Sequence, residues 1–141
     1  MTQNHSDIRT RFIFDDMPIR GMHIRLEKVW HHIVNQKHYP VAIRRALGEL
    51  LAAGSLLSAN LKNEGTLIVQ VQGQGRLKML VVEATSENTV RATARWDETA
   101  EIRDDESLTA LLGENSVFVL THQPKDADPW QGVVPLEGDS I

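Results

Sequence analysis

The side chains that could carry out catalysis are not gathered into a recognisable motif in this sequence. The chain has 141 residues and no cysteine, so it offers no thiol nucleophile, no thiolate ligands for zinc and no thiol redox switch. Ser55 and Ser58 lie inside an apolar helical stretch and match neither GxSxG nor SxxK, the contexts in which a serine is exposed and activated. We therefore expect no catalytic residues.

The histidines do not predict a metal centre. A zinc site needs three or four convergent ligands at fixed spacing. His31 and His32 are adjacent in a helical segment and so point in different directions, and His38 lies beyond the predicted helix end. The remaining histidines are isolated in the sequence: His5, His23 and His122. We therefore expect no metal ligands in this chain.

An acidic segment and a glycine pair have simple structural interpretations. Gly73-Gln74-Gly75 lacks the third glycine of a dinucleotide fingerprint, because Lys78 occupies that position and a strand follows. A hairpin turn is the better interpretation, and we expect no bound cofactor. The carboxylates between residues 97 and 106 predict a solvated loop, with a functional acidic patch as the alternative. They are Asp97, Glu98, Glu101, Asp104, Asp105 and Glu106.

Composition and charge restrict the partners. Hydrophobic residues make up 41% of the chain, charged residues 24%, and the formal net charge is −4 at pH 7, as in ordinary soluble domains. The mild acidity argues against nucleic acid as the main partner. The longest apolar stretch, residues 50–61, is short and interrupted by Gly54 and serines, so it does not predict a membrane span. We expect neither nucleic acid nor membrane as a partner.

The first half of the chain predicts two strands followed by two helices. Apolar residues alternate with other residues over 10–15 and 19–26, as in strands, and Gly21 indicates a close backbone approach. Helical spacing then takes over from 26 to 34. Pro40 is well placed to begin a longer, central helix. Small residues on its apolar side would let another layer pack closely.

The second half predicts strands joined by turns. A short helix over 108–112 is expected among them, with Ser107 as its N-cap and Gly113 at its end. The strands span residues 66–72, 76–83, 89–96, 117–123 and 130–137. Because helices and strands are segregated, we expect an α+β fold. It would be mostly an antiparallel β-sheet, with two central helices between N-terminal strands and a C-terminal β-rich half.

Two features of the second half need an explanation. Apolar residues occupy both faces of the first hairpin, including Ile68 on one strand and Leu80 and Val82 on the other. A sheet exposed on one side alternates more cleanly, so the second face is either part of an ordinary buried sheet or needs a cover. Gly138-Asp139-Ser140 is typical of a helix start, with Asp139 or Ser140 as N-cap, which suggests a cut at an element boundary.

Several stretches together resemble one family. In order and spacing they are similar to the N-terminal part of the redox-regulated chaperone family heat-shock protein 33, and the resemblance runs from about Arg11 to Ile141. The matching stretches are Arg11-Phe12-Ile13-Phe14-Asp15, Ile19-Arg20-Gly21, Tyr39-Pro40, Leu47-Gly48-Glu49-Leu50-Leu51-Ala52-Ala53, Leu56-Leu57-Ser58-Ala59-Asn60-Leu61-Lys62, Val69-Gln70-Val71-Gln72-Gly73-Gln74-Gly75, Val90-Arg91-Ala92-Thr93-Ala94-Arg95 and Gln131-Gly132-Val133-Val134-Pro135-Leu136-Glu137-Gly138-Asp139.

The resemblance implies an ATP-independent holdase of the bacterial cytoplasm that binds unfolding client proteins under oxidative stress. Members are switched on when a C-terminal four-cysteine zinc module oxidises, and active members form homodimers through linker helices. The linker, the zinc module and every cysteine are absent here. The resemblance therefore implies that residues 1–141 are a single core domain, truncated before the linker, with zinc expected only in the absent module.

The resemblance also suggests a role for the second sheet face. We expect Ile68, Leu80 and Val82 to contribute to a surface that the linker normally covers and that clients use once it is free. Two alternatives remain: a small interaction domain that is complete at residue 141, and an enzyme with an unrecognised site. The leading interpretation is a non-enzymatic chaperone core.

Overall fold

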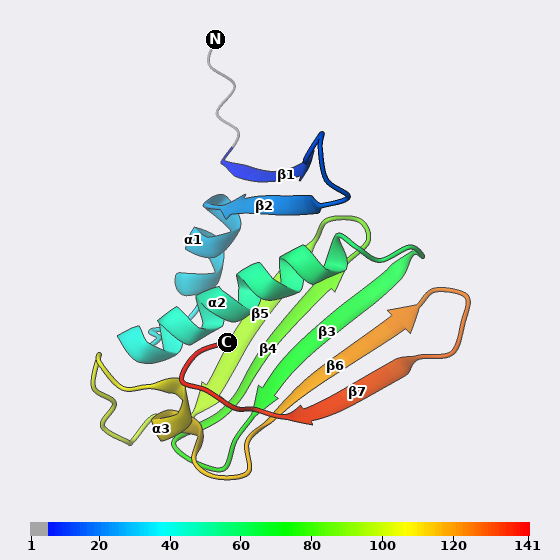
Figure 1. Ribbon diagram of the computed structural model, residues 1–141. Coiled ribbons are helices and arrows are strands. Elements are labelled where there is room, and N and C mark those ends of the chain that lie inside the picture. The colour runs from blue at the N-terminus through cyan, green and yellow to red at the C-terminus, as the bar shows by residue number, and fades with distance from the viewer. Residues whose placement is uncertain (1–5) are drawn as a thin grey trace.

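The computed structural model describes residues 6–141, which form two antiparallel sheets and three helices. β1 and β2 pair with each other, and the other five strands form one sheet in the order β5-β4-β3-β6-β7. This arrangement confirms the predicted α+β fold (Figure 1). The elements are β1 (Asp7–Ile13), β2 (Arg20–Leu26), α1 (Lys28–Val34), α2 (Val41–Ser58), β3 (Gly65–Gln72), β4 (Leu77–Thr85), β5 (Val90–Trp96), α3 (Leu108–Leu112), β6 (Val117–Pro124) and β7 (Trp130–Pro135).

The core lies between α2 and the first three strands of the larger sheet. α2 crosses β5, β4 and β3, whereas β6 and β7 extend beyond the helix (Figure 1). Leu47 and Leu50 of α2 are completely buried. Gly54 allows the helix to approach the sheet, because a Cβ atom there would lie 3.0 Å from Cγ1 of Val82. The close packing predicted from small residues on this helix is confirmed.

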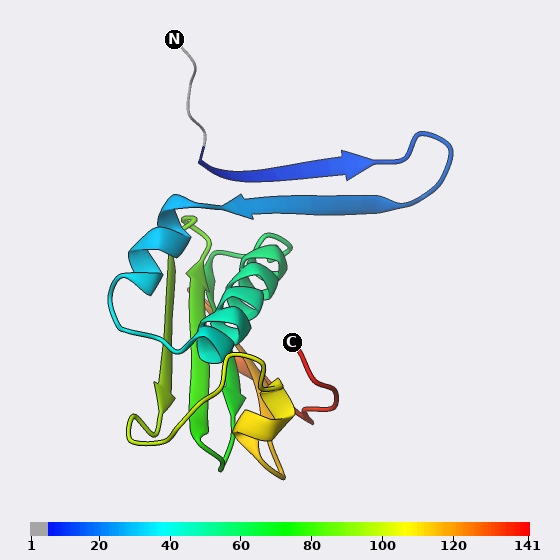
Figure 2. The same ribbon diagram turned by 90° about the vertical axis from the view of Figure 1, so that its left-hand side faces the viewer.

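The β1–β2 hairpin, residues 7–26, extends past the side of the main body, and we call it the hairpin arm (Figure 2). Phe12 pairs with Gly21 across the two strands. The phenyl ring lies directly over the glycine and fills the space that a Cβ atom would need. The close approach predicted at Gly21 is therefore confirmed, and its cause is an aromatic ring.

The base of the arm holds the N-terminus of α1. The Asp7 carboxylate accepts hydrogen bonds from the backbone N–H groups of Glu27, Lys28 and Val29, at 2.6, 3.0 and 3.3 Å. It thereby satisfies donors that a helix start leaves free. A second anchor joins Arg11 Nη2 to the carbonyl oxygen of Ala59 at 2.6 Å. Helical spacing alone could not predict this long-range cap, and α1 begins at Lys28.

Smaller local predictions can be compared with the structure. Ser107 Oγ accepts a hydrogen bond from Ala110 N at 3.2 Å, which confirms the N-cap of α3. In the described residues Asp139 does not start a further helix, and it binds the N-terminal turn of α3 instead. Its carboxylate accepts from the Thr109 hydroxyl at 2.6 Å, and its carbonyl accepts from Leu108 N at 3.2 Å. The last residues are thus held against α3.

In residues 6–141, no helix combines the length and apolar character needed to cross a membrane.

Candidate functional site

The three residues predicted to form one apolar surface do not share a face. Leu80 and Val82 are completely buried, and they pair with Val71 and Val69 on the side of the sheet that α2 covers. Ile68 points to the opposite side and is half-buried. The prediction of a common exposed face is wrong for Leu80 and Val82, because α2 packs on this side of β4, with Gly54 directly against Val82.

The face that α2 does not cover carries other apolar residues. Val81 lies opposite Gln70, Gln70 lies opposite Val119, and Val119 lies opposite Val133. Ile68 belongs to the neighbouring row on the same face. In this row Val81 and Gln70 are half-buried, Val119 is only 6% exposed, and Val133 at β7 is 56% exposed. The open face is thus apolar in patches, and its most exposed part lies at β7.

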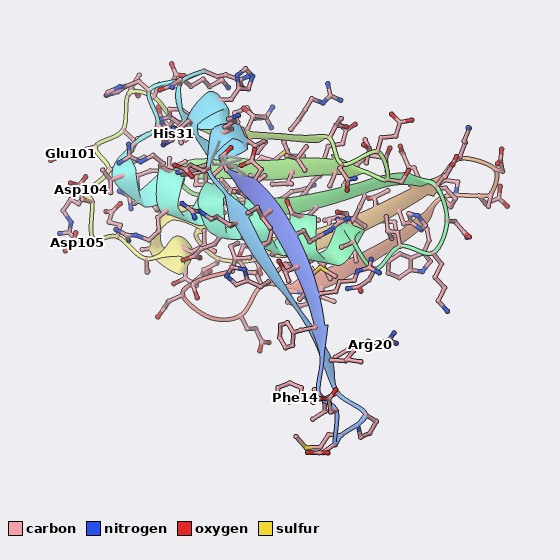
Figure 3. All side chains as sticks on the ribbon, turned by 90° about the horizontal axis from the view of Figure 1, so that it is seen from above. Phe14, Arg20, His31, Glu101, Asp104 and Asp105 are labelled. Atoms are coloured by element: carbon pink, nitrogen blue, oxygen red, sulfur yellow. The ribbon has the colours of Figure 1, made fainter. Side chains whose placement is uncertain are left out.

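Exposed apolar side chains are concentrated on the hairpin arm. Six of the ten large apolar side chains exposed in residues 6–141 belong to it: Ile8, Phe12, Ile13, Phe14, Met17 and Ile19. Ile13 is 74% exposed. The rings of Phe12 and Phe14 meet edge to face, with centroids 6.0 Å apart. Figure 3 shows Phe14 near the far end of the arm, away from the main body. The arm is therefore an apolar surface with few neighbours.

The acidic segment lies at the other end of the molecule. Glu101, Asp104 and Asp105 project from the loop before α3, far from Phe14 and Arg20 on the arm (Figure 3). Two carboxylates of this segment form ion pairs: Glu106 with Arg76 at 2.8 Å, and Asp105 with Arg103 at 3.3 Å. This geometry favours the interpretation as a solvated loop with internal ion pairs.

Asp97 has a perturbed carboxyl group in the acidic loop. The Thr99 hydroxyl and the Thr99 backbone N–H donate hydrogen bonds to Asp97 Oδ1, at 2.7 and 3.0 Å. Hydrogen bonds to the ionised form lower the pKa of Asp97 below its ordinary value of 3.8. The carboxyl is fully exposed. This local turn stabilises an anion and brings no second catalytic group with it.

A cavity of about 590 Å³ lies between the base of the arm and the main body. Ile8, Ile24 and Val90 contribute apolar walls. Ser55 is among the lining residues, and its Oγ is buried and has no hydrogen-bond partner within residues 6–141. No histidine or lysine lies among the residues around this cavity. The carboxylate in the lining, that of Asp7, already accepts backbone N–H groups at the start of α1. Ser55 Oγ makes no hydrogen bond to it, so the lining does not show the paired nucleophile and base of a nucleophilic site.

The histidines remain dispersed in the structure. Within residues 6–141, no three histidine, aspartate or glutamate side chains are grouped so that they could hold a metal ion. His31 and His32 are both exposed on α1, and His32 Nε2 meets Gln36 Nε2 at 3.0 Å. His5 lies outside the described residues. The candidate functional surfaces are accordingly the apolar arm and the exposed part of the larger sheet.

Comparison of the chain with known proteins identifies its family. A family model described as "Hsp33 protein" matches residues 7–141. The chain belongs to the Hsp33 family. It is 82% identical over 138 residues to the 33 kDa chaperonin of Neisseria meningitidis serogroup A, covering 98% of this chain and 46% of that protein. It is 47% identical to the 33 kDa chaperonin of Chromobacterium violaceum, covering 100% of this chain and 48% of that protein.

A solved Hsp33 structure has the same fold. The 33 kDa chaperonin of Thermotoga maritima matches with a TM-score of 0.82 at 21% identity, over 97% of this chain and 48% of that chain. At this identity the likeness concerns the fold alone. This Hsp33-family chain spans about half the length of the relatives it matches. The relatives carry the names of chaperones, and the resemblance inferred from the sequence motifs is confirmed.

The sequence-based search missed the arm as a surface. The sequence contained a pattern that could have revealed it. Ile13 points away from Phe12 and Phe14, so both faces of β1 carry apolar residues. In the sequence, apolar residues on both faces of a strand were interpreted as a possible binding surface in the β3–β4 hairpin, but not in β1. In β3 and β4, α2 buries one of the two apolar faces, and the residues of the other face, such as Ile68, are half-buried. In β1 the same pattern accompanies exposure.

Proposed function

We propose that this chain is the client-binding core of an ATP-independent, redox-regulated holdase of the bacterial cytoplasm. Membership of the Hsp33 family supports a chaperone role. The observation that carries the surface assignment is the concentration of exposed apolar side chains on the hairpin arm. Contiguous exposed apolar surface is typical of sites that bind other proteins. An unfolding client would bury such surface and gain hydrophobic free energy.

The proposed mechanism is capture without turnover. A two-stranded hairpin is marginally stable on its own, so the arm can adjust to clients of different shape while Asp7 and Arg11 hold its base. Ile68 and Val133 on the open sheet face would add a second, weaker apolar surface. No general acid or base is required, because no covalent bond changes. In this proposal the chain is not an enzyme.

The switch and the partners follow from the family resemblance. The 141 residues contain no cysteine, so we place redox control in a zinc-binding cysteine module elsewhere in the whole protein. In the whole protein we propose a homodimer, with unfolded or partly folded proteins as clients. We propose no role in binding nucleic acid or membranes. No cofactor is required by the residues of this chain.

Light scattering from a heat-unfolding reporter protein tests the client surface. Phe14 on the arm and Leu57 on α2 are similarly exposed, at 48% and 42%. We expect Phe14→Ser to raise the molar ratio of this chain to reporter needed for half-suppression of aggregation by about threefold to tenfold. Full burial of a large apolar side chain contributes about 1.5–3 kcal/mol, and Phe14, at 48% exposed, can gain only about half of that. Leu57→Ser is the matched control and should change this ratio little. Equal effects from both variants would contradict binding at the arm.

A further inference from the structure

Two hollows adjoin the base of the arm, and their linings differ in polarity. The cavity of about 590 Å³ between the arm and the main body is lined both by polar side chains and by apolar ones such as Ile24 and Leu26. A second hollow of about 280 Å³ shares Ile24 and Leu26, and its other lining residues are apolar side chains and a glycine of α1 and α2. Along α2, the cavity lies at Ser55 and Ser58 and the second hollow at residues 48–52. The wall therefore changes from amphipathic to apolar along the helix.

Arg9 brings a positive charge to the larger cavity. Its guanidinium donates to Asn88 Oδ1 at 3.0 Å, and this partner is neutral. Within residues 6–141 no ion pair joins Arg9 to a carboxylate. The carboxylate of Asp7, which also lines the cavity, instead accepts three backbone N–H groups at the start of α1. Because a guanidinium carries five N–H donors, Arg9 retains donors for an anion.

The single positive charge restricts the class of ligand. Among residues 6–141, no lysine, histidine or second arginine lines either hollow, so a head group with one negative charge matches the site better than a doubly charged phosphate. A carboxylate also fits the planar guanidinium, which can bind it through two parallel hydrogen bonds. The apolar walls favour an aliphatic chain for the rest of the ligand. The volume of 590 Å³ lies within the range of about 300–1,000 Å³ that is usual for small-molecule sites.

We propose that this site binds a medium-chain fatty acid, with its carboxylate on Arg9 and its aliphatic chain against Ile24 and Leu26. The chain points towards the second hollow, where Trp30 and Leu51 continue the apolar wall. Burial of the chain supplies hydrophobic free energy, and the ion pair selects the acid over an uncharged molecule of the same length. The inference goes beyond client capture and does not rest on it, because the exposed tip of the arm does not line either hollow.

Isothermal titration calorimetry with octanoate and 1-octanol tests the site, because these probes share a chain length and differ in the head group. We expect one octanoate to bind per chain with a dissociation constant between about 10 µM and 300 µM. Binding of 1-octanol should be at least about fivefold weaker, since it lacks the charge that pairs with Arg9. Equal affinities for the two probes, or no saturable octanoate binding up to about 3 mM, would overturn the proposal.

Substitution of Arg9 tests the contact with the head group. Arg9→Gln removes the charge, so the preference for octanoate over 1-octanol should fall to about twofold or less. Arg20→Gln removes a charge from the outer part of the same arm (Figure 3) and is the matched control. Asn88→Gly removes the arm-to-body hydrogen bond of Arg9, and glycine suits the φ of 63° at this position. Both controls should keep the preference, and its loss in either of them, or its retention in Arg9→Gln, would overturn the proposal.

Amide hydrogen exchange and a cavity-filling variant test where the ligand lies. A molecule in this cavity contacts both the arm and the body, so saturating octanoate should slow exchange of β2 amides at least about twofold in the parent and not in Arg9→Gln. Ser58→Leu adds bulk to the lining and should weaken octanoate binding at least about fivefold. Asn60→Leu, at an exposed position outside both hollows, is the control and should not. Protection confined to the tip of the arm, or unchanged affinity in Ser58→Leu, would overturn the proposal.

Discussion

At the scale of single residues, burial separates side chains that look alike in the sequence. Leu80 is completely buried under α2, whereas Ile68 lies half-buried on the open face of the sheet. We expect Leu80→Ala to lower the free energy of unfolding by about 2–5 kcal/mol, the usual range for a buried leucine, and Ile68→Ala to lower it clearly less. Urea denaturation of both variants measures this difference. Equal losses would contradict the assignment of Leu80 to the covered face.

Asp97 offers a prediction about pH. Because the pKa of Asp97 is lower in the folded chain than its ordinary value of 3.8, its ionised form contributes stability above pH 3.8, and this contribution is lost as the pH falls through the lower, folded pKa. Asp97→Asn should therefore be less stable than the parent near pH 6, and the two should converge in acid.

Carboxyl-carbon NMR titration checks the cause of the shift. Thr99→Ala removes the hydroxyl that donates to Asp97 Oδ1 at 2.7 Å, which is the largest cause of the lowered pKa. In this variant the Asp97 pKa should move up towards 3.8. An unchanged titration curve would mean that the hydroxyl does not hold the anion.

At the scale of elements, the two sheets should differ in local stability. β1 and β2 pair only with each other, whereas β3 lies between β4 and β6 and is covered by α2. Amide hydrogen exchange reports such local opening. We expect amides of β1 and β2 to exchange at least about tenfold faster than those of β3 and β4. Comparable protection in both sheets would contradict a separately opening arm.

The base of the arm can be tested in the same measurement. The Asp7 carboxylate accepts three backbone N–H groups at the start of α1. Asp7→Ala should therefore speed exchange both in the arm and in the first turn of α1. Asp15, in the turn at the far end of the arm, makes no such cap, so Asp15→Ala is the control and should leave α1 unchanged.

Most elements could be predicted from the sequence because their signals are local. The period change near residue 26, the Ser107 cap and the Gly73–Gly75 turn each depend on neighbours within a few residues. The cover of a sheet face is decided by contacts between distant segments. Whether α2 would pack on the face of Leu80 or on that of Ile68 depends on the direction of the chain after residue 62. Periodicity shows that both faces are apolar, but not which face the helix covers.

At the scale of the whole molecule, the arm and β7 are separate surfaces with different chemistry. The arm exposes large apolar side chains, including Phe14, away from the main body (Figure 3). β7 combines Trp130 and Val134 with free backbone groups at a sheet edge. Apolar side chains accept many partners, so capture of varied clients fits the arm.

The missing thiols lead to a prediction about peroxide. Without cysteine, the sulfur atoms open to oxidation belong to methionines. Met17 on the arm is 51% exposed, while Met22 and Met79 are half-buried, so of these three methionines mass spectrometry should find the sulfoxide first at Met17. A sulfoxide makes an apolar side chain polar, which weakens capture at the arm. Peroxide should thus lower, and never raise, suppression of reporter aggregation by this chain. Met17→Leu keeps the apolar surface without the sulfur and should resist the loss, whereas a peroxide-dependent gain would mean that these 141 residues contain a switch of their own.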